Sequence, residues 1–575
     1  MAFCKTAGSA FPESKSRSFA DGLYRNPCIW GGMCAMAYTS LKFFFFIAVV
    51  MLLYFRFPWK QHKWGVLLAA SYFFYLLVSY RLVAFLLFTT ASTYASALWI
   101  EHISVQTKQA IAAHKGEWDR ETKKTVKNQA NRKKRWILAA VLVGNFGIMV
   151  FLKYYNLFAG SLNEILGGAG MSFSVPTLQL ILPLGISFYT FQSMGYLIDV
   201  YWEKVQAQKN LAKFALFVSF FPQIVQGPIS MYDQLAHQLY TPSSFDFTRF
   251  KYAAELMLWG TFKKLVIADR AVIALNAATE SYGTWNGTTL AFLILLYAIQ
   301  IYADFSGGID ISRGVAQIFG IDMVDNFRQP YFARSVSEFW QRWHITLGGW
   351  FKKYLFYPLA VSSAFSSLGK KIRSSRLGAT KAGQHIGKVL PTGLASFIVF
   401  LLVGAWHGAN WKYLGFGLWF GGIMMISALL APLYGLALEK FKINGKSLRF
   451  RLFQMLRTFA LVCLGYIFDV APNLTQSLST FWRLLTDHSI STALKQIQEL
   501  QLEIRHYQII FLGTVLVFLV DVYHERNGCH ILRKNLDDRP FAVRYLLIVG
   551  CLLATLYYGV WGPSFGASAF VYMQF

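Results

Sequence analysis

The chain has 575 residues, of which 55% are hydrophobic and only 14% are charged. This composition excludes an ordinary soluble enzyme, because such proteins carry about 25% charged residues, and it predicts an all-α polytopic membrane protein. The net charge of +27 does not indicate a nucleic-acid partner, since the basic residues lie in short loops between apolar runs. The six cysteines show no C-x-x-C pair and no ligand spacing with histidine, so we expect no disulfide framework and no metal site.

The N-terminal segment 1–35 is rich in Ser, Gly, Ala and basic residues and has no apolar core. It contains no continuous hydrophobic region, so it does not fit a signal peptide. Apolar sequence begins only after Met36, and we hypothesise that translation starts at Met33 or Met36. We therefore expect a disordered extension, 1–35, followed by a single transmembrane domain, 36–575.

Apolar runs long enough to approach a membrane span follow in quick succession. A helix needs about 20 apolar residues to cross the bilayer, and the segments 41–57, 64–80 and 82–100 come near that length. A basic loop comes next, which marks the cytoplasmic side by the positive-inside rule and also suits a solvated amphipathic helix. Its basic residues are Lys108, Lys115, Arg120, Lys123, Lys124, Lys127, Arg132, Lys133, Lys134 and Arg135. The segment 136–155 then leaves the cytoplasm, and 178–201 returns to it.

Two segments in the middle of the chain interrupt the pattern of spans. Pro183 lies early in 178–201 and predicts a kink, while Gln192 places a polar side chain at membrane depth. The segment 214–229 contains two prolines and is too short and too broken for a clean span. We expect it to be a re-entrant or half-crossing element, because irregular backbone at membrane depth must be buried in protein or line a cavity.

Charged and small residues next gather at the end of an apolar run. Spans are expected at 252–275 and 290–301, and the second leads into the glycine-rich stretch 302–314, which contains Asp304 and Ser306. A charge in the middle of the membrane costs about 2.5–3.5 kcal/mol on insertion scales, so these side chains should pair or face water. The glycines match neither a Walker loop nor a dinucleotide fingerprint, because no strand precedes them.

The remaining spans alternate consistently with the positions of the basic loops. The segment 392–405 would run outward and 411–431 inward, followed by the pair 452–470 and 509–522 and a last span at 543–560. This order places the residues just after 405 near the outer face of the membrane.

Two histidines that each follow a tryptophan are the strongest candidates for chemistry. Ser335 and Glu338 fit a capping box and predict a helix that carries His344. His407 interrupts the apolar sequence between the spans 392–405 and 411–431, where an imidazole needs a protein or water partner. Taken alone, each histidine suits either a functional site or a structural hydrogen bond between helices. On one continuous helix, His344 would share a stripe with Ser337, Trp340, Gln341, Leu347 and Gly348.

The chemistry that these residues suit is acyl transfer. A neutral imidazole can take the proton of a hydroxyl group while the oxygen attacks a thioester carbonyl, and the thiolate leaves without help from a metal. Arg342, Lys352 and Lys353 offer positive charge for the phosphates of a nucleotide-like donor, although the two lysines fit positive-inside anchoring better. The sequence has no G-x-S-x-G elbow, no H-E-x-x-H and no kinase motifs.

Several motifs together resemble the membrane-bound O-acyltransferase (MBOAT) family, and most closely its bacterial alginate O-acetyltransferase and D-alanyl-teichoic-acid branch (AlgI/DltB-like). The resemblance runs from about residue 38 to the end of the chain, and the combination is highly specific although no single motif is. The motifs are Tyr302-Ala303-Asp304-Phe305-Ser306-Gly307, Asn326-Phe327, Phe339-Trp340-Gln341-Arg342-Trp343-His344-Ile345-Thr346-Leu347, Trp406-His407-Gly408-Ala409-Asn410-Trp411 and Phe570-Val571-Tyr572-Met573-Gln574-Phe575.

This resemblance implies a bundle of about 11 transmembrane helices with re-entrant or half helices around a central tunnel. A thioester donor, acetyl-CoA in the first instance, would enter from the cytoplasm, with no bound cofactor and no metal. The acyl group would leave at the outer face of the cell (plasma or inner) membrane, towards a polysaccharide and an SGNH-type acyltransferase partner. His407 matches the family's signature histidine and His344 its upstream partner, so both are expected to be catalytic. Donor or substrate contacts are expected from Arg342, Trp343, Trp406, Asn410, Asp304, Ser306 and Gln192.

Two features leave alternatives open. Gln341 and Gly348-Gly349 depart from the residues usual in alginate-type proteins, which puts the acceptor and partner in doubt more than the reaction. The donor could be a D-alanyl or other acyl carrier protein instead of acetyl-CoA, and the length and alginate-like ending favour acetyl-CoA. A transporter or flippase in which Asp304, Asp310 and Arg313 line the substrate path is the alternative from another class, but the inverted repeat typical of transporters is missing from the pattern of spans.

Overall fold

The computed structural model describes residues 37–528 and 531–561, so the predicted extension 1–35 lies outside the described residues. Within the described ranges the chain folds into helices joined by turns and loops and has no β-strand, which confirms the predicted fold class. Eight helices there are long and apolar enough to cross a membrane, and the chain is a multi-pass membrane protein. The expected count of about 11 spans is not confirmed, because helices α2, α3 and α6 have only 16 or 17 residues.

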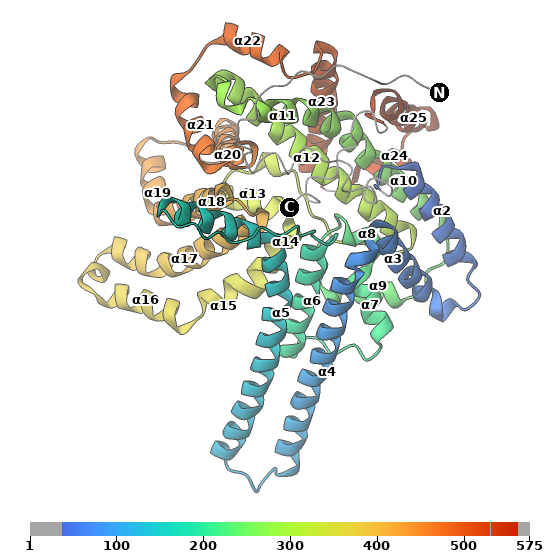
Figure 1. Ribbon diagram of the computed structural model, residues 1–575, viewed down its shortest axis with the longest axis vertical. Helices are drawn as coiled ribbons and strands as arrows, with labels where there is room; N and C mark the ends of the chain where they lie inside the picture. The colour runs from blue at the N-terminus through green and yellow to red at the C-terminus, as the bar shows by residue number, and fades with distance from the viewer. Residues whose placement is uncertain (1–36, 529–530, 562–575) are drawn as a thin grey trace.

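Two long antiparallel helices, α4 (Val83–Ala113) and α5 (Arg120–Gly168), dominate the N-terminal part, and their far ends project from the body of the molecule (Figure 1). The basic loop of the sequence forms these far ends, so it is helical as well as basic. Asp119 begins α5 by accepting a hydrogen bond from the N–H of Thr122 at 2.8 Å. The preceding helices α2 (Leu41–Arg56) and α3 (Lys63–Ser79) pack against each other, with short 3₁₀ turns at Lys60–His62 and Tyr80–Leu82.

A single buried helix covers only the later part of the long span that was predicted for 178–201. Helix α6 (Ile186–Tyr201) begins only after Gly185, whose φ is +68° and whose added Cβ would lie 2.1 Å from the carbonyl oxygen of Ile224. Pro183 therefore precedes the helix, and the predicted kink is wrong. The broken element predicted at 214–229 is confirmed, because α7 (Leu211–Ser219) and α8 (Phe221–Ile224) give way to a loop before α9 (Tyr232–Tyr240).

Helix α12 (Gly287–Ile318) lies at the centre of the fold and contacts helices from both halves of the chain (Figure 1). It follows α10 (Phe247–Phe262), the π-helical turn η4 (Lys263–Ala268), α11 (Asp269–Glu280) and a 3₁₀ turn at Tyr282–Thr284. The helix is longer than the span expected at 290–301, because it continues through the glycine-rich stretch 302–314. A Cβ on Gly307 would lie 2.8 Å from the carbonyl oxygen of Gly260, so these glycines let α10 and α12 pack closely.

The C-terminal part contains the helices that carry the two tryptophan–histidine motifs. After a 3₁₀ turn at Pro330–Phe332, the chain forms α13 (Val336–Arg342), α14 (Ile345–Phe351), the π-helical turn η7 (Lys352–Phe356) and α15 (Tyr357–Ala360). Next come α16 (Ser363–Ser374), a 3₁₀ turn (Arg376–Ala379), α17 (Lys381–His407), α18 (Trp411–Leu429) and α19 (Ala431–Lys440). The last helices are α20 (Leu448–Val470), α21 (Leu474–Thr486), α22 (Ile490–Gln498), α23 (Ile504–Asn527), α24 (Ile531–Asp537) and α25 (Phe541–Tyr558).

Candidate active site

His344 lies at a break between two short helices. Ser335 caps α13 as predicted, with its hydroxyl accepting the N–H of Glu338 at 3.1 Å, but the Glu338 carboxylate accepts the N–H of Arg334 and not that of Ser335. The helix ends at Arg342, and His344 adopts a left-handed conformation with φ +46° and ψ +52°. The expected stripe on one continuous helix is therefore wrong. A non-glycine residue held in this region costs about 1–3 kcal/mol, and such strain is commonly found at functional sites.

A neighbouring loop holds the backbone around His344 in place. The N–H of Ile345 donates to the carbonyl of Asn326 at 3.0 Å, and the N–H of Arg328 donates to the carbonyl of Arg342 at 2.9 Å. Phe327 and Trp343 form an isolated antiparallel bridge between these bonds. The left-handed turn is thus fixed on both sides by backbone hydrogen bonds, which compensate its strain.

The side chain of Asn326 determines which nitrogen of His344 carries the proton. Its Oδ1 accepts the backbone N–H of Thr346 at 3.1 Å and the Thr346 hydroxyl at 2.9 Å. Because a backbone N–H can only donate, the atom that faces it must be the amide oxygen. The same oxygen lies 3.2 Å from Nδ1 of His344, so Nδ1 is the donor. The neutral ring is held in the tautomer whose lone pair is on Nε2, as a general base requires.

His407 is the last residue of α17, where that helix packs very closely against α18. An added Cβ on Gly404 would lie 2.3 Å from the carbonyl oxygen of Tyr413, and one on Gly417 would lie 2.6 Å from that of Phe400. Small residues at such positions let two membrane helices approach backbone to backbone. The His407 ring packs against Phe416, with ring centroids 4.6 Å apart. The predicted position of His407 in the turn between two spans is confirmed.

Trp406 brings the two histidines into one buried cluster. The centroid of its ring lies 6.0 Å from the His344 ring and 5.3 Å from the His407 ring. The two histidine side chains are only 3% and 7% exposed, and the edge of Phe305 packs on His344 with centroids 4.7 Å apart. Lys153 of α5 donates a hydrogen bond to the carbonyl oxygen of Trp406. The segments that carry His344 and His407, which lie more than 60 residues apart in the sequence, therefore meet as predicted.

Three of the other predicted residues make structural contacts in the same region. Trp343 packs against Phe327 with ring centroids 5.0 Å apart and belongs to the aromatic core beside α13. Asn410 caps α18 by accepting the N–H of Lys412 at 3.0 Å. Gln192 donates to the carbonyl oxygen of Phe217 at 3.0 Å and thereby joins α6 to α7. Their predicted roles in substrate binding stay predictions.

Two of the three basic residues expected to bind donor phosphates, Arg342 and Lys353, are engaged with carboxylates, whereas Lys352 is exposed and lies over the ring of Tyr357. Arg342 makes a two-pronged ion pair with Glu525 of α23, with distances of 2.7 and 3.0 Å, and a second ion pair with Glu338 at 2.8 Å. Lys353 lies 2.8 Å from a carboxylate oxygen of Asp199, which is buried in α6. These guanidinium and ammonium groups join α13 to α23 and η7 to α6.

Asp304 and Ser306 belong to a buried network between α12 and the π-helical turn η4. Lys264 lies 2.6 Å from Asp304 and 2.7 Å from Asp269, and its neighbour Lys263 lies 2.7 Å from Asp310 and 2.9 Å from the hydroxyl of Ser306. The wider π turn allows both consecutive lysines to reach α12. The prediction that the charges of 302–314 pair within the protein is confirmed.

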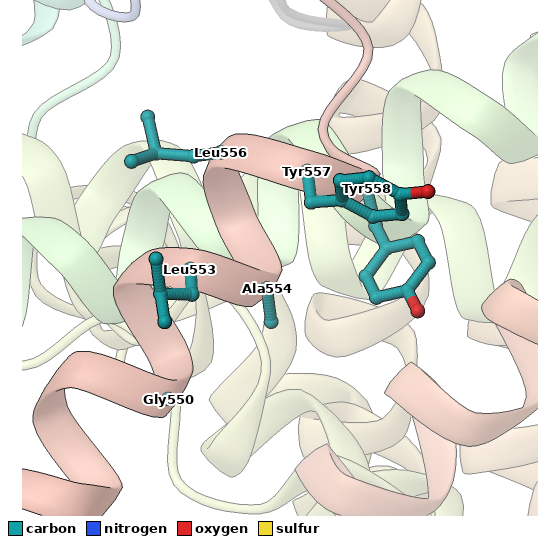
Figure 2. Close-up of a pocket in the computed structure, with 6 residues that line it drawn as sticks. All are labelled: Gly550, Leu553, Ala554, Leu556, Tyr557 and Tyr558. Carbon is teal, nitrogen blue, oxygen red and sulfur yellow. The ribbon is translucent and has the colours of Figure 1, made fainter.

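Figure 2 shows a shallow hollow on the last helix, α25. Its lining is apolar except for two tyrosine hydroxyls, and it includes none of the residues of the histidine cluster. The lining residues are Gly550, Leu553, Ala554, Leu556, Tyr557 and Tyr558. Because it offers no acid, base or cation, this hollow does not compete with the histidine cluster as a candidate site.

Sequence reasoning did not identify three residues that contact the histidine cluster. Asn326 and Phe305 stood within the recognised motifs, but nothing in their types alone indicated a role at His344. Lys153 had no signal at all, because a lysine within an apolar span is not distinguishable from an interfacial anchor until its helix is placed beside α17.

The comparisons with known proteins identify the family of the chain. The model of the MBOAT, membrane-bound O-acyltransferase, family matches residues 203–377, which include His344. The probable alginate O-acetylase AlgI of Pseudomonas aeruginosa is 32% identical over 459 residues, which cover 78% of this chain and 74% of that protein. The chain belongs to the membrane-bound O-acyltransferase family.

Other membrane-bound O-acyltransferases are similar over smaller parts of the chain. The peptidoglycan O-acetyltransferase of Helicobacter pylori is 31% identical over 381 residues, covering 61% of this chain and 64% of that protein. The teichoic acid D-alanyltransferase of Bacillus subtilis is 26% identical over 306 residues, covering 52% of this chain and 71% of that protein. The family membership makes this chain a multi-pass O-acyltransferase and confirms the predicted enzyme class.

Proposed function

We propose that this membrane-bound O-acyltransferase takes an acetyl group from a cytoplasmic thioester, acetyl-CoA, and delivers it across the membrane for O-acetylation of a cell-surface polysaccharide. Three of its relatives are named for acyl transfer to alginate, peptidoglycan and teichoic acid, and all three acceptors are polymers of the cell envelope. The cell (plasma or inner) membrane is the corresponding location, with a secreted SGNH-type acyltransferase as the partner that completes the transfer.

The observation that carries this proposal is the pairing of His344 with Asn326 beside Trp406 and His407. Nε2 of His344 accepts the proton of a hydroxyl group while its oxygen forms a C–O bond to the thioester carbonyl carbon. The C–S bond then breaks, and the imidazolium returns the proton to the thiolate. His407, on the other side of Trp406, is the second catalytic imidazole and holds the acceptor hydroxyl or the carbonyl in line.

The proposal is tested with purified protein in lipid nanodiscs and acetyl-CoA labelled in the acetyl group. We expect release of free CoA and label transfer to an added polysaccharide or partner, with both activities lost in His344→Ala and His407→Ala. His385→Ala is the matched control, because His385 lies on the same helix as His407 but near its other end. Equal turnover in folded His344→Ala and His407→Ala would refute the acyl-transfer mechanism and leave transport without chemistry as the better reading.

The D-alanyl alternative rests on the relative from Bacillus subtilis and makes a different prediction. If the donor is a D-alanyl thioester on a carrier protein, labelled acetyl-CoA gives no turnover while the loaded carrier protein does. Running the two donors side by side on the same preparation therefore identifies the donor.

A further inference from the structure

Helix α8 and the loop that follows it are buried along their whole length, and other segments anchor several of their polar atoms. All residues from Phe214 to Ser230 are buried. The Tyr38 hydroxyl donates to the carbonyl oxygen of Pro222 at 2.8 Å, and the N–H of Phe221 donates to the Ser71 hydroxyl at 3.1 Å. Buried backbone in a membrane protein needs such partners, because the hydrocarbon supplies none.

Gln226 is the exception in this loop. Its side chain is 0% exposed, yet neither its amide nitrogen nor its amide oxygen has a hydrogen-bond partner in the described part of the chain. In the preceding helix α8, Gln223 donates to the carbonyl oxygen of Pro228 at 2.5 Å, but its own amide oxygen has no partner among the described residues. Each buried polar atom without a partner costs about 1–3 kcal/mol, so a carboxamide in this position favours the binding of a polar group beside it.

A short chain of hydrogen bonds connects this loop to His344, the proposed general base. The N–H of Ile229 donates to the Thr346 hydroxyl at 3.0 Å, and that hydroxyl donates to Oδ1 of Asn326, the oxygen that holds His344. The amide nitrogen of Asn326 also has no partner among the described residues and is buried. Buried amide atoms without a partner thus occur at both ends of this chain of hydrogen bonds, on Gln226 in the loop and on Asn326 beside His344.

We infer that Gln226, with Gln223, binds an amide group of the thioester donor and holds the donor beside His344. A carboxamide offers one acceptor and two donors, which complement the C=O and N–H of a secondary amide. The thiol arm of CoA and the arm of a thioester carrier protein both contain such amides, so the inference holds for either source. It rests on the proposed function, because it names a contact for the donor of that reaction.

The test compares donors with and without amides in the Gln226→Leu variant, which keeps the size of the side chain and removes its polar atoms. With acetyl-CoA we expect kcat/KM to fall roughly 10- to 100-fold, as for the loss of one or two hydrogen bonds in a buried site. With S-ethyl thioacetate, which has no amide, kcat/KM should be unchanged. The melting temperature should stay the same or rise, because the variant removes buried polar atoms that have no partner.

The matched control is Gln238→Leu, because both ends of the Gln238 carboxamide are bonded to the backbone of Asp322. We expect this control to lower the melting temperature and to leave the ratio of the two donor rates unchanged. A Gln226→Leu variant that is destabilised and slowed equally with both donors would show a structural role and overturn the inference, as would unchanged kcat/KM for acetyl-CoA. A carrier-bound acetyl donor should lose the same factor as acetyl-CoA.

Calorimetric binding of CoA separates failure of this inference from failure of the proposed function. If wild-type protein turns over acetyl-CoA but the Kd of CoA is the same in Gln226→Leu, the inference fails and the function stands. If wild-type protein shows no thioester turnover while Gln226→Leu weakens CoA binding tenfold or more, the function fails and the binding contact stands. No CoA binding and no turnover in the wild type would refute both.

Discussion

Removing the side chain of Asn326 tests the tautomer argument directly. In Asn326→Ala, the oxygen that accepts from the backbone and hydroxyl of Thr346 and from Nδ1 of His344 is lost. The N–H of Thr346 is then a buried donor without a partner, which costs about 1–3 kcal/mol. The two other donors can turn towards new partners, so we expect a total loss of stability of about 2–4 kcal/mol.

The effect on turnover is larger than stability alone explains. During reaction the His344 ring becomes positively charged, and a hydrogen bond to a charged group contributes about 1.5–3 kcal/mol. Losing the bond to Asn326 should therefore lower kcat by roughly 10- to 150-fold, at an acetyl-CoA concentration that saturates the enzyme. The measurement is thioester turnover in nanodiscs, with the melting temperature of the same samples recorded by intrinsic fluorescence.

Asn286→Ala is the matched control for this variant. Asn286 is also a buried asparagine whose oxygen accepts a backbone N–H, that of Thr289 at 2.8 Å, but it lies at the start of α12, away from the histidine cluster. It should lose comparable stability and keep its kcat. If folded Asn326→Ala keeps kcat within twofold of the wild type, the role of Asn326 in setting the tautomer is refuted.

Three further predictions concern backbone strain, helix packing and pH. At the left-handed His344, Gly should be more stable than Ala by about 1 kcal/mol in thermal melts although both variants are inactive, and equal stability would argue against strain. Gly404→Ala should destabilise the α17–α18 pair by at least about 2 kcal/mol, whereas Gly422→Ala, with open space at its Cβ, should change stability by less than about 1 kcal/mol. Lys108 is the largest cause that lowers the pKa of Glu203 from 4.5 to about 2, so the stability from this ion pair is present above pH 4.5 and is lost as the pH falls towards 2. Hydrogen exchange of the backbone amides around Lys108 and Glu203 should become faster as the pH falls through this range in the wild type. It should not do so in Glu203→Gln.

The parts of the fold that sequence could predict are those set by local pattern. Apolar length predicted the long helices, the prolines of 214–229 predicted the broken crossing, and a serine followed by a glutamate predicted the start of α13. The tryptophan–histidine pairs predicted that 344 and 407 belong together, and the ring contacts through Trp406 agree with that prediction.

The errors arose where contacts distant in sequence override the local pattern. The helix after Ser335 was expected to continue through His344, but backbone bonds from the loop at Asn326 hold the chain in a left-handed turn there. The span was expected to cover 290–301, yet the helix continues through the glycines of 302–314, which let α12 pack against Gly260. The residues around His344 do not reveal the loop at Asn326, and the residues 302–314 do not reveal the neighbouring helix that carries Gly260.

A polar side chain at membrane depth therefore does not by itself indicate a functional site in this protein. Its role depends on which partners the folded chain gives it. Asp304 and Ser306 are polar groups in apolar sequence, and the structure gives them Lys264 and Lys263 as partners, while their predicted role in substrate binding stays a prediction. Gln226 lies in the predicted broken element 214–229 and was not selected as a site residue, yet its buried amide has no partner in the described part of the chain. A ligand that gives partners to a buried amide gains the hydrogen bonds that the folded chain does not supply there, which makes Gln226 a candidate for binding a substrate.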